Sequence, residues 1–76
     1  MTGPEARSLR QTLGMRQARL AWDTGVANTL LSRWEQGYYR LRPEQVAAIS
    51  AHLSRRLQEI KAMELPRQEE TTEVSG

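Results

Sequence analysis

Small and apolar residues recur at fixed spacing over residues 17–36, and this spacing constrains the fold more than any other feature. The positions concerned hold Leu20, Ala21, Gly25, Val26, Leu31 and Trp34. A small alanine lets two helices cross closely, and a glycine accepts the positive φ of a tight turn. The larger apolar side chains can fill the wedge between the helices. The pattern therefore predicts two short helices, over residues 17–24 and 28–36, joined by a tight turn.

The rest of the chain also favours helix. Phenylalanine is absent and β-branched residues are sparse, so no strand pattern is recognisable. A first helix is expected to carry Pro4 in its first turn and to stop at Gly14. Its apolar side consists of Ala6, Leu9 and Leu13. We therefore expect an all-α fold.

A fourth helix is expected to begin at Pro43, after a loop over residues 38–42. Its apolar stripe consists of Val46, Ile49, Leu53, Leu57 and Ile60. Because neither Gly nor Pro stands between Pro43 and Pro66, one long helix and two helices with a kink near Ser54 are both possible. Residues 66–76 are polar and acidic without periodicity, which predicts a disordered tail after a domain over residues 1–65.

Length and composition exclude several classes of protein. A chain of 76 residues makes one domain with a thin margin of stability. Without cysteine, and with His52 as the single histidine, disulfides and metal sites are not expected. No paired nucleophile and base and no glycine-rich phosphate loop occur in the sequence, so we expect neither a cofactor nor enzymatic activity. Oligomerisation is the support that remains for so small a core.

The chain start has no basic segment followed by an apolar one, and no apolar run approaches the roughly 20 residues of a membrane span. We therefore expect a cytoplasmic protein. Charge is divided along the chain: residues 1–56 hold nine arginines and four acidic residues, a net +5, whereas residues 57–76 have a net charge of −3. Because arginine forks onto phosphates and guanine edges, the basic part permits a nucleic-acid partner.

The helix over residues 28–36 separates its residue types by side. At 100° per residue, Leu30, Leu31 and Trp34 fall on one side, with Ala27 just ahead of them. The other side consists of Asn28, Thr29, Ser32, Arg33 and Gln36. Every one of these side chains can donate to a phosphate or a base edge, and none is acidic. This side is therefore predicted to face double-stranded DNA.

Residues 9–37 read LRQTLGMRQARLAWDTGVANTLLSRWEQG and resemble the Cro/cI-type (lambda-repressor-like, XRE) helix-turn-helix family. The resemblance covers about residues 6–53, and SRWEQG is its most specific piece. It implies a compact domain of five helices, four plus a C-terminal one, whose third helix lies in the major groove. It further implies base-edge contacts, a phosphate contact by Gln17 at the start of helix two, and an ion pair between Arg10 and Glu35. The base-reading residues would be Asn28, Thr29, Ser32 and Arg33.

The sequence departs from the family pattern at three places. Arg16 and Ala27 stand where Ser or Thr normally caps helices two and three, at a cost of about 1 kcal/mol each. Arg16 can contact a phosphate instead. Thr24 occupies a position that is normally aliphatic.

Several side chains keep two interpretations. Arg33 can fork onto guanine or bind phosphate alone, and Asn28 can read adenine or cap helix three. The residues expected at phosphates are Arg16, Gln17, Gln36, Arg40 and Arg42. Tyr38 and Tyr39 can add hydroxyl contacts or pack within the loop. Trp22 is expected to cover helix four or the loop, and His52 to lie on the surface or at an interface.

The apolar stripe beyond Ile49 also has two interpretations. Residues 54–65 can fold back on their own core as a fifth helix. Alternatively, Leu53, Leu57 and Ile60 form an isologous homodimer interface, which would place two recognition helices on a palindrome.

These expectations combine into a homodimeric, sequence-specific DNA-binding repressor of bacterial, phage or plasmid origin. One alternative is an antitoxin-like module that binds another protein, which the acidic segment 57–76 favours. Another is an excisionase-like accessory factor of recombination.

Overall fold

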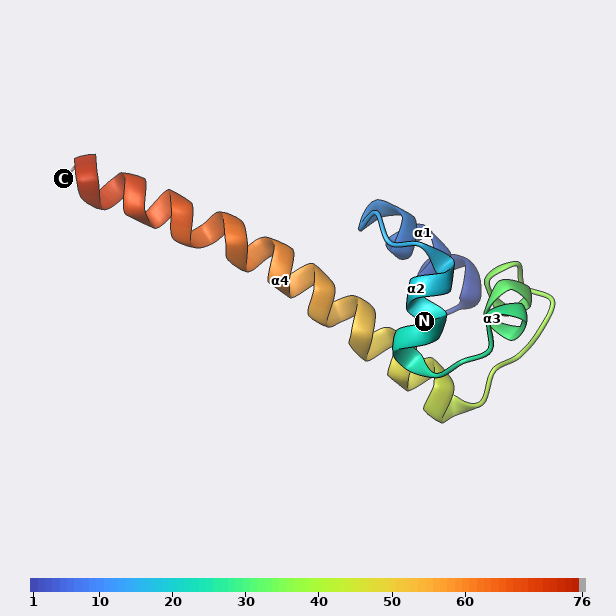
Figure 1. The fold of residues 1–76 in the computed structure, drawn as a ribbon. Coiled ribbons are helices and arrows are strands. Elements are labelled where there is room, and N and C mark those ends of the chain that lie inside the picture. The colour runs from blue at the N-terminus through green and yellow to red at the C-terminus, as the bar shows by residue number, and fades with distance from the viewer. Residues whose placement is uncertain (76) are drawn as a thin grey trace.

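The computed structural model describes the backbone of residues 1–75 and the side chains of residues 1–63. Four helices follow one another: α1 (Gly3–Thr12), α2 (Gln17–Thr24), α3 (Asn28–Glu35) and α4 (Pro43–Ser75). The described part contains no strand. Figure 1 shows α1, α2 and α3 gathered around the first part of α4, whose later turns continue away from them. The all-α prediction is confirmed, and the three short helices begin and end within one or two residues of their predicted limits.

The start of α1 is fixed by a reciprocal pair of hydrogen bonds. The backbone N–H of Thr2 donates to Glu5 Oε1 at 2.7 Å, and the backbone N–H of Glu5 donates to Thr2 Oγ1 at 3.2 Å. This is a capping box, which satisfies two backbone donors at a helix start. The bond from the Thr2 backbone lowers the pKa of the Glu5 carboxyl below its ordinary value.

The turn between α2 and α3 depends on Gly25, which adopts φ 72° and ends α2 in the left-handed conformation. A side chain is strained at this φ, whereas glycine adopts it freely. Thr24 adapts to its half-buried position because its Oγ1 donates to the carbonyl of Leu20 at 2.7 Å. The hydroxyl is therefore satisfied within α2, and the position needs no aliphatic side chain.

The core lies where the three short helices meet α4. It consists of Ala6, Leu20, Ala21, Val26, Leu31, Trp34, Leu41, Ile49 and Leu53. All of these except Leu41 belong to the predicted apolar pattern. Leu41 is 4% exposed and anchors the loop between α3 and α4 in the core.

The predicted fifth helix is not a separate element, since α4 is continuous from Pro43 to Ser75. With neither Gly nor Pro between residues 43 and 66, nothing in that sequence forces a break. Residues 54–63 therefore do not fold back as a separate helix. Arg56 and Glu59 still line a depression with Leu13 and Met15, and α4 continues beyond the body from there (Figure 1). The predicted disordered tail, residues 66–76, lies outside the residues whose side chains are described, and the domain boundary at residue 65 stays a prediction.

The predicted dimer interface is wrong at Leu53. Its side chain is 0% exposed and lies in the core with Ile49, so it is unavailable to a second chain. Helical spacing identifies an apolar stripe but does not show where the body of the domain ends. Leu57 and Ile60, farther along α4, are half-buried and lie outside the core cluster.

Candidate nucleic-acid interface

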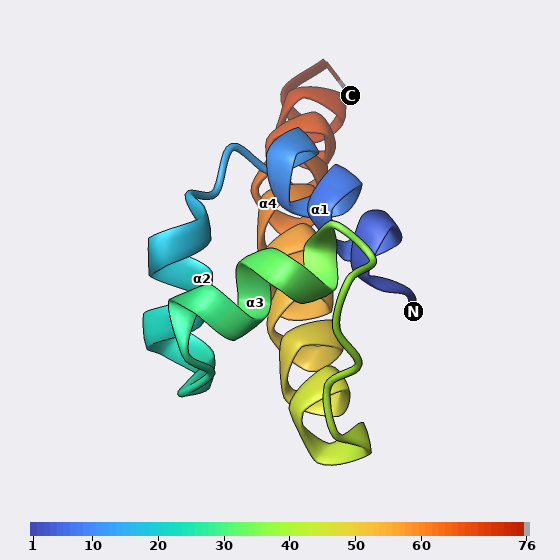
Figure 2. The same ribbon diagram turned by 90° about the vertical axis from the view of Figure 1, so that its right-hand side faces the viewer.

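The two sides of α3 differ as the sequence predicts. Leu31, Trp34 and Glu35 are buried, whereas Asn28, Thr29, Arg33 and Gln36 are exposed. Ser32 is half-buried, and its Oγ accepts a hydrogen bond of 3.4 Å from Gln36 Nε2. Leu30 is half-buried against the core, and Ala27 is exposed at the helix start. In Figure 2, α3 crosses in front of α4, so its outer side faces away from the body.

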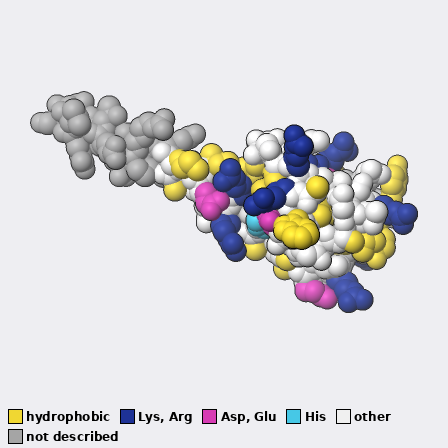
Figure 3. Space-filling view, viewed as in Figure 1, with side chains coloured by type: hydrophobic (Ala, Val, Ile, Leu, Met, Phe, Trp, Pro, Cys, Tyr) yellow, Lys and Arg dark blue, Asp and Glu magenta, His cyan; other side chains and the backbone are white. Residues whose placement is uncertain are grey.

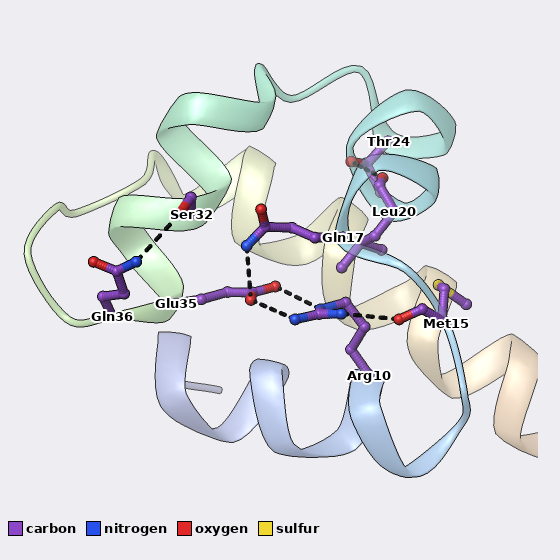
Figure 4. A network of polar contacts seen from close by, with 8 residues as sticks. All are labelled: Arg10, Met15, Gln17, Leu20, Thr24, Ser32, Glu35 and Gln36. Atoms are coloured by element: carbon purple, nitrogen blue, oxygen red, sulfur yellow. Dashed lines mark hydrogen bonds and ion pairs between the residues drawn. The ribbon is translucent and has the colours of Figure 1, made fainter.

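A buried ion pair holds α3 against α1. Arg10 Nε donates to Glu35 Oε2 and Arg10 Nη2 to Glu35 Oε1, both at 3.0 Å, in a parallel fork (Figure 4). Arg10 Nη1 donates to the carbonyl of Met15 at 2.9 Å. The pair that the family resemblance implies is therefore present, and both charges are satisfied. Such a pair fixes geometry, because an unpaired charge in this place would be costly.

Gln17 takes part in the same network. Its Nε2 donates to Glu35 Oε1 at 3.1 Å, so the start of α2 is tied to the end of α3 (Figure 4). One amide hydrogen of Gln17 is used in this bond, and the second is left for another acceptor. The side chain was expected at a phosphate; in this structure it first serves to position α2 against α3.

A depression of about 190 Å³ lies next to this network, where α1, α2 and α3 meet. Gln17 of α2, Ser32 of α3 and Gln36 after α3 line it, together with Arg7 of α1. Arg7 is exposed and was missed by the sequence interpretation. It stands one helical turn before Arg10, and since Arg10 contacts Glu35, that spacing could have placed Arg7 near Gln36.

The loop after α3 presents both aromatic and basic side chains. Tyr38 is 81% exposed and does not pack within the loop, whereas Tyr39, at 44% exposed, is more than half covered. Arg40 and Arg42 are exposed on either side of the buried Leu41. The buried leucine thus fixes a loop whose neighbouring arginines point to solvent. Figure 3 shows Lys and Arg side chains on several sides of the body, including the edge where α3 lies.

The starts of α2 and α3 lack side-chain caps, as their sequences predict. Arg16 and Ala27 occupy the cap positions, and neither makes a side-chain hydrogen bond to its helix. Among the described residues, Asn28 has no hydrogen-bonded partner for its side chain that would replace the cap at Ala27. The Asn28 amide is therefore exposed and free to contact a ligand.

One expectation about α2 is wrong. Trp22 was expected to cover helix four or the loop, but it is 86% exposed. Its place beside α4 is taken by Asp23, whose Oδ2 lies 3.2 Å from His52 Nε2 and 3.0 Å from Arg19 Nε. His52 is thus a half-buried link between α2 and α4.

The family model of the helix-turn-helix domain matches residues 3–62, which include α1, α2, α3 and the first turns of α4. The chain belongs to this helix-turn-helix family. Helix-turn-helix domains bind DNA, and the resemblance to the Cro/cI type agrees with this membership. No curated protein and no solved structure matches the chain significantly.

In the part of the chain that the structure describes, none of the helices combines the length and the apolar character of a membrane span. No three His, Cys, Asp or Glu side chains in that part of the chain are grouped so that they could hold a metal ion.

Proposed function

We propose that the protein is a homodimeric repressor that reads a palindromic operator with α3 in the major groove. The observation that carries the proposal is the outer side of α3, which is exposed, has no acidic residue and is supported by the buried Arg10–Glu35 fork. Asn28, Thr29, Ser32 and Arg33 would read base edges, because amide, hydroxyl and guanidinium groups match the donors and acceptors there. Repression needs no further activity, because a protein bound tightly to a promoter excludes the polymerase from it.

Phosphate contacts would flank this helix. Arg7, Gln17 and Gln36 line one depression beside Ser32, so several donors can converge on a single phosphate. Arg16 at the start of α2 and Arg40 and Arg42 after α3 are exposed and would add salt-dependent affinity.

The second chain would pair through the projecting part of α4. Leu57 and Ile60 lie there, outside the core, and this part of α4 extends to the side of the body away from α3 (Figure 1). Pairing there would leave both copies of α3 free for DNA. Two copies placed one helical turn apart, about 34 Å, would read a palindrome.

Selection of bound duplexes from random DNA tests the proposal. A homodimeric repressor should enrich a palindrome whose half-sites lie about one helical turn apart. Enrichment of a single unrepeated half-site would contradict the dimer. A pool that shows no enrichment would contradict sequence-specific binding.

A further inference from the structure

Trp22 is the one large aromatic side chain in the two central helices that the fold does not use. It is 86% exposed, whereas Trp34, the second tryptophan of the chain, is 6% exposed in the core. The packing of α2 is supplied by Leu20 and Ala21. An indole that buries so little of its surface in the monomer gains most of its contact area only when a partner covers it.

The surroundings of Trp22 connect it with the outer side of α3. Together with Ala18 and Val26, it lines an open depression of about 530 Å³ that continues to Ala27 and Asn28. The depression therefore runs from α2, across the turn, to the first residue of α3. Figure 2 shows this place, where the end of α2 leads into the start of α3. No charged side chain lines the depression, so its occupant is recognised by an apolar surface and a few polar groups.

The width of the major groove indicates what would lie beside the start of α3. The groove is about 12 Å wide and a helix with its side chains about 10–12 Å across, so an inserted helix has a sugar–phosphate strand close on each side. A residue that lies next to Asn28, outside α3 itself, would then face such a strand. Deoxyribose carbons are apolar and phosphate oxygens accept hydrogen bonds, which matches an indole with its apolar body and its single N–H donor.

We infer that Trp22 is a DNA-contacting residue that packs against the sugar–phosphate backbone beside the base faced by Asn28. This inference rests on the proposed function, since it requires α3 to lie in the groove. It adds a contact from α2 at the N-terminal end of α3, at the opposite end from the depression that contains Gln17 and Gln36.

Quenching of tryptophan fluorescence by acrylamide tests this contact directly. Trp34 is buried, so Trp22 should account for most of the quenchable emission, and the variant Trp22→Phe gives the remaining signal of Trp34. The full chain is titrated with a fluorescein-labelled, mixed-sequence duplex of about 20 bp at about 50 mM salt, so that two half-sites fit and non-specific binding is retained. The anisotropy of the label reports DNA binding independently of the tryptophans.

The expected result is a severalfold fall in the quenching of Trp22 at the DNA concentration that saturates the anisotropy. If the anisotropy saturates while Trp22 stays as quenchable as in the free protein, Trp22 lies off the DNA and the inference is wrong, although the proposed function stands. If the anisotropy does not change, no DNA is bound, and both the proposed function and the inference fail.

Variants separate this contact from an ionic one. Trp22→Ala should weaken DNA binding about tenfold and Trp22→Phe, which keeps an aromatic ring but no donor, by less. Because no charge is removed, the dependence of the affinity on salt should keep its slope. Gln58→Ala, at an exposed position on the projecting part of α4, is the control and should bind as the unchanged protein does. Equal affinity of Trp22→Ala and the control would contradict the contact.

Discussion

Gly3 lies so close to Trp34 that a Cβ added to it would stand 1.8 Å from the Trp34 carbonyl oxygen. The start of α1 and the end of α3 therefore touch through their backbones, next to the ion pair that joins the same two helices. The neighbouring atoms are backbone, so they cannot yield as the end of a flexible side chain could.

Gly3→Ala is expected to destabilise the protein by about 2 kcal/mol, because the methyl group must push α1 and α3 apart. Chemical denaturation monitored by circular dichroism measures the loss. Ser8→Ala, at an exposed position of the same helix, is the control and should change stability little. Helix propensity alone favours alanine over glycine, so an increase in stability would show that the close contact is absent.

The Arg10–Glu35 fork leads to a second prediction. Arg10→Met or Glu35→Leu alone should cost about 3–5 kcal/mol, because each leaves the other charge buried without its partner. The double variant should lose less free energy of unfolding than the two single variants lose together, since it leaves no unpaired charge. Denaturation of the three variants gives the coupling. Losses that simply add would mean that the two side chains do not interact.

The capping box at α1 gives a pH dependence. Hydrogen bonds from the backbone and hydroxyl of Thr2 hold the pKa of Glu5 below its ordinary value of 4.5. The charged carboxylate therefore stabilises the folded state above pH 4.5, and this contribution is lost as the pH falls through the lower pKa of the folded state. Melting temperatures of the unchanged protein and Glu5→Gln should differ at pH 7 and converge in acid. A difference that persists at pH 2 would contradict this origin.

The projecting part of α4 supports a prediction about assembly. Leu57→Glu should give a monomer by light scattering and should weaken operator binding about a hundredfold, because two linked half-site contacts become one. Gln58→Glu places the same charge at the neighbouring exposed position and should leave the dimer intact. The pairing surface is wrong if Leu57→Glu and Gln58→Glu have the same mass in solution.

The sequence predicts the three short helices well because a glycine follows each of them and the apolar spacing between Gln17 and Trp34 permits one close crossing. Other features do not follow from periodicity. Leu41 lies in a loop, where no repeat distinguishes a buried residue from an exposed one. Arg10 and Glu35 are 25 residues apart, and only the family resemblance relates them. The sequence interpretation missed the capping box at Thr2 and Glu5, although a threonine three residues before a glutamate at a helix start is its usual signature.

The sequence predicts which helix faces DNA, but not which residues of the neighbouring helices lie beside it. The outer side of α3 follows from its own 100° spacing, whereas the positions of Trp22 and Arg7 depend on how α2 and α1 are rotated against α3. That rotation is set by tertiary contacts such as the bond from Gln17 to Glu35. For the same reason the apolar spacing alone does not show that Leu53 is buried in the core whereas Leu57 lies outside it.

Binding titrations of Arg33→Ala and Arg40→Ala test most directly whether α3 reads DNA. Each duplex would carry one substituted base pair of the selected site. Arg33→Ala should lose discrimination of about 1–3 kcal/mol at one position. Arg40→Ala should weaken binding to all duplexes alike and lower the salt slope by about one. If Arg33→Ala keeps both the affinity and the base preference of the unchanged protein, the outer side of α3 is not the surface that reads DNA.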